Sequence, residues 1–110
     1  MSIVRPKKHL GQHFLKDKNI ATKIVKAIDQ CESETVLEIG PGTGILTNQL
    51  INNPEINFYA IEVDVESYEY LKSTYPSKAD RLIYKDFLKI SLNDFFNHPI
   101  TIIGNFPYNI

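Results

Sequence analysis

The first segment with the residues for ligand chemistry is the loop Gly40–Gly44, which reads GPGTG and follows the apolar run Val36–Ile39. Glycine adopts positive φ and has no Cβ, so this loop can turn sharply and let a ligand approach its backbone. A helix-compatible segment, Ile45–Ile51, comes next. The combination predicts a nucleotide-binding unit in which exposed amides and a helix N-terminus face the ligand. The alternative is a glycine-rich turn in an ordinary α/β domain.

The spacing of the glycines restricts the kind of nucleotide. Gly40, Gly42 and Gly44 form G-x-G-x-G, which differs from the G-x-G-x-x-G that grips a dinucleotide pyrophosphate. The Gly-Lys-Ser/Thr of a P-loop is also missing, so this loop is not expected to hold a triphosphate with magnesium.

Two acidic residues further along the chain fit the parts of a nucleoside. Glu62 follows Gly44 by eighteen residues, near the ~20 expected for a carboxylate that binds ribose hydroxyls. Asp64 competes for that role, and a solvated strand end is the alternative. Asp86 can accept a hydrogen bond from the adenine amine while Phe87 covers the ring. An ordinary loop aspartate remains the other interpretation of Asp86.

The segment Asn105–Tyr108, reading NFPY, has the groups needed to activate an exocyclic amine. Such an amine is a poor nucleophile because its lone pair is delocalised into the base. Two hydrogen-bond acceptors for its N–H groups can pull the nitrogen toward tetrahedral geometry and so make the lone pair available. The side-chain oxygen of Asn105 and the carbonyl of Phe106 can be these acceptors, with the backbone restricted by Pro107. Tyr108 can stack on a base that is unpaired or flipped out. The alternative is an Asn-Pro turn that ends a strand.

These residues depend on a predicted alternation of strands and helices. The expected helices are Lys18–Gln30 capped by Asp17, Ile45–Ile51 capped by Thr43, Val65–Tyr75, and one or two turns over Ser91–Phe96 opened by Ser91. The expected strands are Val36–Ile39, Asn57–Val63, Arg81–Tyr84 and Ile100–Gly104. This order predicts a parallel sheet with right-handed crossovers. Gly40, Glu62, Asp86 and Asn105 then meet at the carboxyl edge, where α/β sheets bind ligands.

Charge is distributed unevenly along the 110 residues, whose formal net charge is −1. Residues 1–18 hold five basic side chains and one acidic, whereas residues 19–110 hold seven basic and twelve acidic. The basic arm predicts contact with a polyanion such as RNA through Arg5, Lys7 and Lys8. A solvated tail is the alternative.

Composition favours one globular domain or part of one, with 43% hydrophobic and 23% charged residues. No apolar run approaches the ~20 residues of a membrane span, and no signal peptide is recognisable. The single cysteine, Cys31, excludes an internal disulfide and fits a cytoplasmic location. His9, His13 and His98 lack metal-ligand spacing, so no metal site is expected.

Four segments carry a resemblance to a known family. Glu38–Gly44, EIGPGTG, resembles motif I of the S-adenosylmethionine-dependent methyltransferases. NFPY is similar to the N/D-x-P-Y/F motif IV of enzymes that methylate exocyclic amines. Leu10–Asp17, LGQHFLKD, looks like the N-terminal signature of the ribosomal RNA adenine N6-methyltransferases. Gly104–Ile110 resembles the GNLPYNI of the KsgA-type adenine dimethyltransferases, with Phe106 in place of Leu.

The resemblance implies an α/β, Rossmann-like methyltransferase fold in which the first four parallel strands are present and the sheet is incomplete. Family members continue with three more strands and a helical domain. It implies a basic arm over residues 1–16 and the N-terminal part of a catalytic domain over residues 17–110. S-adenosylmethionine would contact His13, Leu15, Gly40, Gly42, Glu62, Asp86 and Asn105. His13 stands where many members have Asn.

The activity implied is N6-dimethylation of adenines in small-subunit ribosomal RNA, coupled to maturation of that subunit, with this chain as an N-terminal part that is inactive by itself. One alternative is the large-subunit adenine methyltransferase of the antibiotic-resistance type. Another is a non-catalytic relative that binds RNA or DNA. The Gly before Asn105 and the Asn-Ile after Tyr108 favour the dimethyltransferase.

Overall fold

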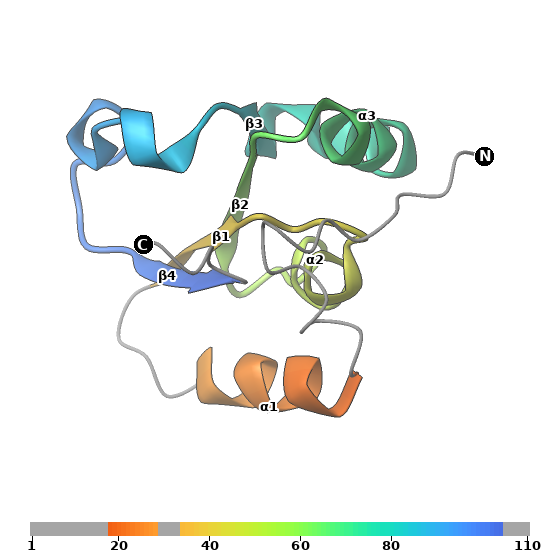
Figure 1. The fold of residues 1–110 in the computed structure, drawn as a ribbon. Helices are drawn as coiled ribbons and strands as arrows, with labels where there is room; N and C mark the ends of the chain where they lie inside the picture. The colour runs from red at the N-terminus through yellow and green to blue at the C-terminus, as the bar shows by residue number, and fades with distance from the viewer. Residues whose placement is uncertain (1–17, 29–33, 105–110) are drawn as a thin grey trace.

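The computed structural model describes residues 18–28 and 34–104, and within these ranges helices alternate with parallel strands (Figure 1). The helices are α1 (Lys18–Ile28), α2 (Ile45–Leu50) and α3 (Val65–Thr74), and the strands are β1 (Thr35–Ile39), β2 (Asn57–Glu62), β3 (Leu82–Tyr84) and β4 (Thr101–Gly104). Three 3-10 helices complete the set: η3 (Pro76–Arg81), η4 (Phe87–Lys89) and η5 (Leu92–Asp94). The predicted strands and the three main helices are confirmed, with ends that differ by one or two residues.

The four strands form one parallel sheet in the order β3-β2-β1-β4. Ile39 at the end of β1 is in register with Ile61 of β2 on one side and with Gly104 of β4 on the other. The strand order reverses between β1 and β4, which is the switch point where open α/β sheets bind ligands. The predicted α/β fold class is therefore confirmed, and the glycine loop leaves β1 at this point.

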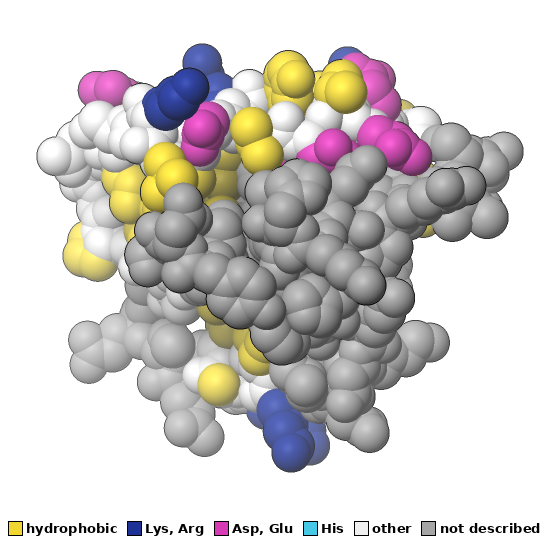
Figure 2. Space-filling model, viewed as in Figure 1, with side chains coloured by type: hydrophobic (Ala, Val, Ile, Leu, Met, Phe, Trp, Pro, Cys, Tyr) yellow, Lys and Arg dark blue, Asp and Glu magenta, His cyan; other side chains and the backbone are white. Residues whose placement is uncertain are grey.

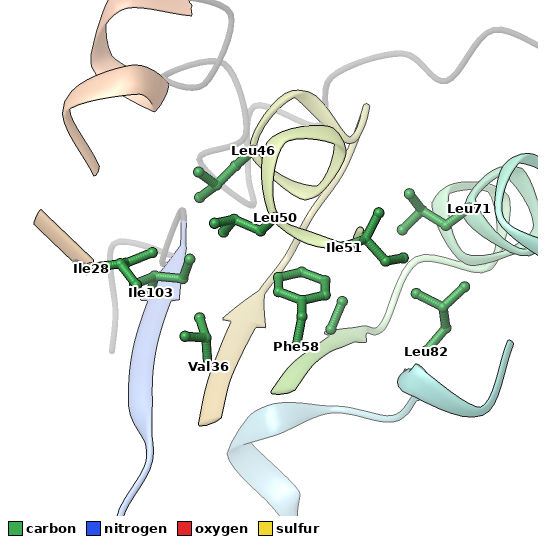
Figure 3. Packing of buried hydrophobic residues seen from close by; sticks show 10 residues of the cluster. Ile28, Val36, Leu46, Leu50, Ile51, Phe58, Leu71, Leu82 and Ile103 are labelled. Atoms are coloured by element: carbon green, nitrogen blue, oxygen red, sulfur yellow. The ribbon is translucent and has the colours of Figure 1, made fainter. Parts of the chain in front are cut away.

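The sheet has an apolar layer on each face. One layer joins the sheet to α1, α2 and α3 through Val36, Leu46, Leu50, Phe58 and Leu71 among others (Figure 3). The other gathers Leu37, Ile39, Ile61 and Phe96, next to η4 and η5. Every residue of β1 is buried, as expected of a central parallel strand covered on both faces.

Neither of the predicted helix caps that the structure describes makes a side-chain cap bond. Gly44, with φ of 84°, is the N-cap of α2 and no side chain caps that helix, so Thr43 does not have the predicted role. Ser91 precedes η5 without a side-chain cap bond. Instead, the Oδ2 of Asp64 caps α3 by accepting from the backbone N–H of Ser67 at 3.0 Å. Asp17, the predicted cap of α1, lies outside the described residues.

Candidate active site

The glycine loop binds back onto the sheet with its own amides. The N–H of Gly40 donates to the carbonyl of Ile61 at 3.0 Å, and the N–H of Gly44 donates to that of Pro41 at 2.9 Å. The N–H of Gly42 donates to the Glu62 carboxylate at 3.0 Å. These three amides therefore do not face a ligand, contrary to what was predicted for them. All three are used to hold the loop, whose glycines have φ between 56° and 84°.

Glu62, the last residue of β2, connects the loop to the next strand. Its Oε1 accepts from Gly42, and its Oε2 accepts from the N–H groups of Val63 and Asp64 at 2.9 and 3.0 Å. The residue is 2% exposed. Burial raises the pKa of the carboxyl group, while the three amide donors lower it. A carboxylate has about four acceptor positions, so one position on Glu62 remains for a further donor such as a hydroxyl.

Glu38 in β1 is a second buried carboxyl group, and its surroundings could not be predicted from the sequence. It is fully buried, and its Oε1 accepts a short hydrogen bond from the hydroxyl of Thr47 in α2. Its Oε2 has no hydrogen-bond partner. Burial raises the pKa of Glu38 to about 8, and the nearby charge of Glu62 adds to the effect. Glu38 is therefore a neutral acid at pH 7 and links β1 to α2 beneath the loop.

Asp86 follows β3 at the same edge of the sheet, since Tyr84 at the end of β3 is in register with Glu62. Its Oδ1 accepts from the N–H of Leu88 at 3.0 Å and so caps η4. The other carboxylate oxygen takes part in no described hydrogen bond. The structure thus brings Gly40, Glu62 and Asp86 to one edge, as the sequence predicted.

Val63 is an apolar residue at this edge that sequence reasoning missed. It separates Glu62 from the capping residue Asp64, and 45% of its surface is exposed. Its signal in the sequence was an apolar residue directly after the predicted ribose-binding carboxylate. An exposed aliphatic side chain beside a carboxylate suits a ligand with an apolar ring and a polar sugar.

Gly104 ends β4 at the point where no side chain would fit. A Cβ there would lie 2.2 Å from the carbonyl oxygen of Ile39, and its φ is 138°. Only glycine lets β4 approach β1 so closely while it leads toward Asn105. In the sequence, Gly104 was noted only as part of a family motif. The close approach of β4 to β1 explains why a glycine stands at this position.

A cavity of about 350 Å³ lies between α2 and α3, and the last two residues of the glycine loop, Thr43 and Gly44, are part of its lining. Thr43, Tyr70 and Tyr75 are among its lining residues, and Tyr75 donates from its hydroxyl to Asn48 at 2.9 Å. None of Gly40, Glu62 and Asp86 lines it. The cavity therefore adjoins the end of the glycine loop without including the predicted ribose-binding and adenine-binding carboxylates.

The remaining predicted site residues lie outside the described residues: Arg5, Lys7, Lys8, His13, Leu15, Asn105, Phe106, Pro107 and Tyr108. The structure neither supports nor opposes their predicted roles.

The family of the chain follows from comparison with known proteins. The family model described as ribosomal RNA adenine dimethylase matches residues 3–110. The chain belongs to the ribosomal RNA adenine dimethylase family. The resemblance seen in the sequence is thereby confirmed over nearly all of the chain, and membership of this methyltransferase family implies the use of a methyl donor.

Three relatives of this family member are called ribosomal RNA small subunit methyltransferase A. The protein of Flavobacterium johnsoniae is 50% identical, that of Cytophaga hutchinsonii 49%, and that of Bacteroides fragilis 46%. Each match includes the whole chain and 42%, 43% and 40% of the relative, respectively. The chain thus spans about two fifths of the length of these relatives.

The part of the chain that the structure describes has neither a helix able to span a membrane nor a cluster of metal-binding side chains. No described helix is long and apolar enough to cross a bilayer. Among the same residues, no group of three or more His, Cys, Asp or Glu side chains could hold a metal ion.

Proposed function

We propose that the protein containing this chain transfers methyl groups from S-adenosylmethionine to N6 of adenines in small-subunit ribosomal RNA, two per base, during maturation of that subunit in the cytoplasm. The observation that carries the proposal is the closed glycine loop. The amides of Gly40, Gly42 and Gly44 bind Ile61, Glu62 and Pro41, so they are not available to a phosphate. The edge therefore suits an uncharged ribose and base better than a pyrophosphate, and this disfavours an NAD-dependent dehydrogenase.

The residues present fit such a nucleoside. The unused acceptor position of Glu62 can take a ribose hydroxyl, and the free oxygen of Asp86 can accept from the adenine amine. Val63 offers an exposed apolar surface for the ring. His13, Leu15, Gly40, Gly42 and Asn105 complete the proposed cofactor-binding set, by resemblance to the family. When bound, S-adenosylmethionine supplies an electrophilic methyl group on a sulfonium.

The chain's own catalytic contribution lies in the four residues after β4. The side-chain oxygen of Asn105 and the backbone carbonyl of Phe106 would accept hydrogen bonds from the two N–H groups of the target amine and so favour a lone pair localised on nitrogen. The nitrogen would bond to the methyl carbon as the bond from that carbon to sulfur breaks, and it would then release one proton to solvent. Pro107 restricts the backbone, and Tyr108 stacks on the flipped base. Positioning then accounts for most of the rate, without a strong general base.

The domain organisation is part of the proposal. Residues 1–16 form a basic arm in which Arg5, Lys7 and Lys8 contact RNA phosphates, and residues 17–110 form the N-terminal part of the catalytic domain. The relatives' names, which specify the ribosomal RNA small subunit, support the choice of substrate. A ribosomal RNA substrate requires neither a membrane nor a metal.

Methyl incorporation by the full-length protein tests this function. We expect transfer of labelled methyl groups to unmethylated small subunits, a loss of at least a hundredfold in rate with Asn105→Ala, and little change with Asn97→Ala, an exposed asparagine. Incorporation unaffected by Asn105→Ala would remove the amine-acceptor mechanism. Incorporation into large subunits alone would instead identify the antibiotic-resistance type of enzyme.

A further inference from the structure

A basic cavity lies at the opposite end of the sheet from Gly40 and Glu62. Its volume is about 260 Å³, and it is bounded by the turn between α2 and β2, the first residues of β2, and the end of η3. The two charged residues in its lining, Lys78 and Arg81, are both cations. Three asparagines, Asn52, Asn53 and Asn57, supply amide groups.

The strand β2 fixes the position of this cavity relative to the candidate active site. Asn57 begins the strand and lines the cavity, whereas Glu62 ends it at the ligand-binding edge. Five residue steps of a parallel strand cover ~17 Å. The cavity is thus a separate site on the same rigid element.

Arg81 is held in place while most of its donors stay available. Its guanidinium carbon lies 4.7 Å from the ring centroid of Tyr59, a cation–π arrangement that limits its motion. Its ion pair is the long contact from Nε to the exposed Asp80, at 3.8 Å. Its two terminal nitrogens are not part of that pair, and their planar fork matches the oxygens of a phosphate.

The neighbouring groups add further donors. Lys78 forms no ion pair within residues 18–28 and 34–104, so its ammonium group is available to an anion. Asn53 accepts from the N–H of Glu55 through Oδ1 at 2.9 Å, which leaves the two N–H donors of its amide for another partner.

We propose that this cavity binds a phosphate of the RNA backbone while the target adenine occupies the opposite edge of the sheet. Two cations and three asparagines line a space of about 260 Å³, large enough for one phosphate, and charge-assisted bonds to phosphate are the strong ones. The distance of ~17 Å to Glu62 is well within one turn of a nucleic acid duplex, ~34 Å. This inference rests on the proposed RNA substrate.

The test compares charge variants of the full-length protein in their binding of small-subunit ribosomal RNA over a series of salt concentrations. Each phosphate contact contributes ~0.7–0.9 to the slope of log affinity against log salt. We expect the Lys78→Gln/Arg81→Gln variant to lower that slope by about 0.8, the contribution of one phosphate, and to lower affinity at 0.1 M salt on the order of tenfold, with S-adenosylmethionine affinity unchanged. Arg81→Lys keeps the charge and loses only part of this effect, because the planar fork is missing.

Lys72→Gln is the matched control, since this exposed lysine of α3 lies over Tyr68 and outside the cavity. It should leave the slope close to wild type, whereas Lys78→Gln, which leaves the Tyr59 stack intact, should lower it by roughly half of the loss in the double variant. If Lys78→Gln and the double variant both keep the wild-type slope while the wild-type protein methylates the RNA, the proposed phosphate site is wrong and the proposed function stands. Failure of the wild type to bind or methylate the RNA overturns the proposed function and this inference with it.

Inorganic phosphate distinguishes the two sources of the anion. The backbone amide NMR signals of Asn52, Asn53 and Asn57 should shift when RNA is added, and the shift should disappear in the double variant. Signals that respond to inorganic phosphate and not to RNA would assign the cavity to a free phosphate and overturn the RNA assignment.

Discussion

Two buried glutamates at the carboxyl edge of the sheet show how hydrogen-bond partners determine charge. Glu62 has three backbone donors, whereas Glu38 has one hydroxyl donor and an Oε2 without a partner. Burial raises the pKa of both groups, but only Glu62 has several amides that oppose this. The pKa of Glu38 therefore reaches about 8, and in the folded protein it keeps a proton that the unfolded chain releases near pH 4.5.

This difference predicts an unusual pH dependence of stability. Between pH 4.5 and about 8 the folded state holds the proton of Glu38 and the unfolded state does not, so the free energy of unfolding falls as pH rises. In Glu38→Gln, a neutral amide keeps the acceptor for Thr47 and removes this loss. We expect the free energy of unfolding of the variant, relative to that of wild type, to increase by on the order of 1 kcal/mol per pH unit from pH 5 to 8. Urea denaturation of the full-length protein at several pH values measures this.

Glu69→Gln provides the control, because Glu69 is an exposed carboxylate on α3. Its stability relative to wild type should stay constant over the same pH range. A constant difference for Glu38→Gln as well would mean that Glu38 is ionised in the folded protein.

At the scale of elements, the pairing of β1 with β4 depends on one glycine. In Gly104→Ala the added methyl group would meet the carbonyl of Ile39 at 2.2 Å, and φ of 138° is unfavourable for alanine. We expect β4 to shift away from β1, with a loss of roughly 1–3 kcal/mol in the free energy of unfolding and a large loss of methyl transfer. Calorimetry and the methyl-incorporation assay check these two effects. Ile102→Ala, at a partly exposed position of the same strand, should leave methyl transfer largely intact.

The start of α3 gives a second prediction at this scale. Asp64 accepts from both the backbone N–H and the hydroxyl of Ser67. Asp64→Ala removes this cap and should lower the free energy of unfolding by about 1 kcal/mol. Asp64→Asn retains an acceptor and should recover most of the loss. Thermal unfolding of both variants measures this effect, and Asp80→Ala, at an exposed position, is the reference. Equal stability of Asp64→Ala and Asp80→Ala would contradict the capping role of Asp64.

The regular elements could be predicted from sequence because their signals are local. Alternating apolar runs and breakers placed all four strands and the three main helices, and the parallel order placed Gly40, Glu62 and Asp86 at one edge. The partners of the glycine amides could not be predicted, because they depend on how β1 and β2 lie side by side. For the same reason the sequence did not reveal the neutral state of Glu38.

At the scale of the whole molecule, the two ends of β2 differ in the charge of the side chains around them. Figure 2 shows Lys and Arg side chains at the lower end, where Figure 1 draws α1, and also at the upper end beside Asp and Glu side chains. The edge with Glu62, Asp64 and Asp86 is acidic, and the basic cavity lies at the other end of β2. An acidic edge repels phosphate, so under the proposed function RNA phosphates would bind to basic groups elsewhere while a neutral base enters this edge.

If the arm and the cavity hold the same RNA, their contributions to the salt dependence should add. Arg5→Gln/Lys7→Gln/Lys8→Gln removes three cations and should lower the slope of log affinity against log salt by about 2.4. Combined with Lys78→Gln/Arg81→Gln, the loss should be close to the sum of the two separate losses, because well-separated sites act independently. Filter binding of small-subunit RNA measures this slope for the full-length wild type, the arm variant, the cavity variant and their combination. A combined loss no greater than that of the arm variant would show that the cavity contacts no phosphate once the arm is bound.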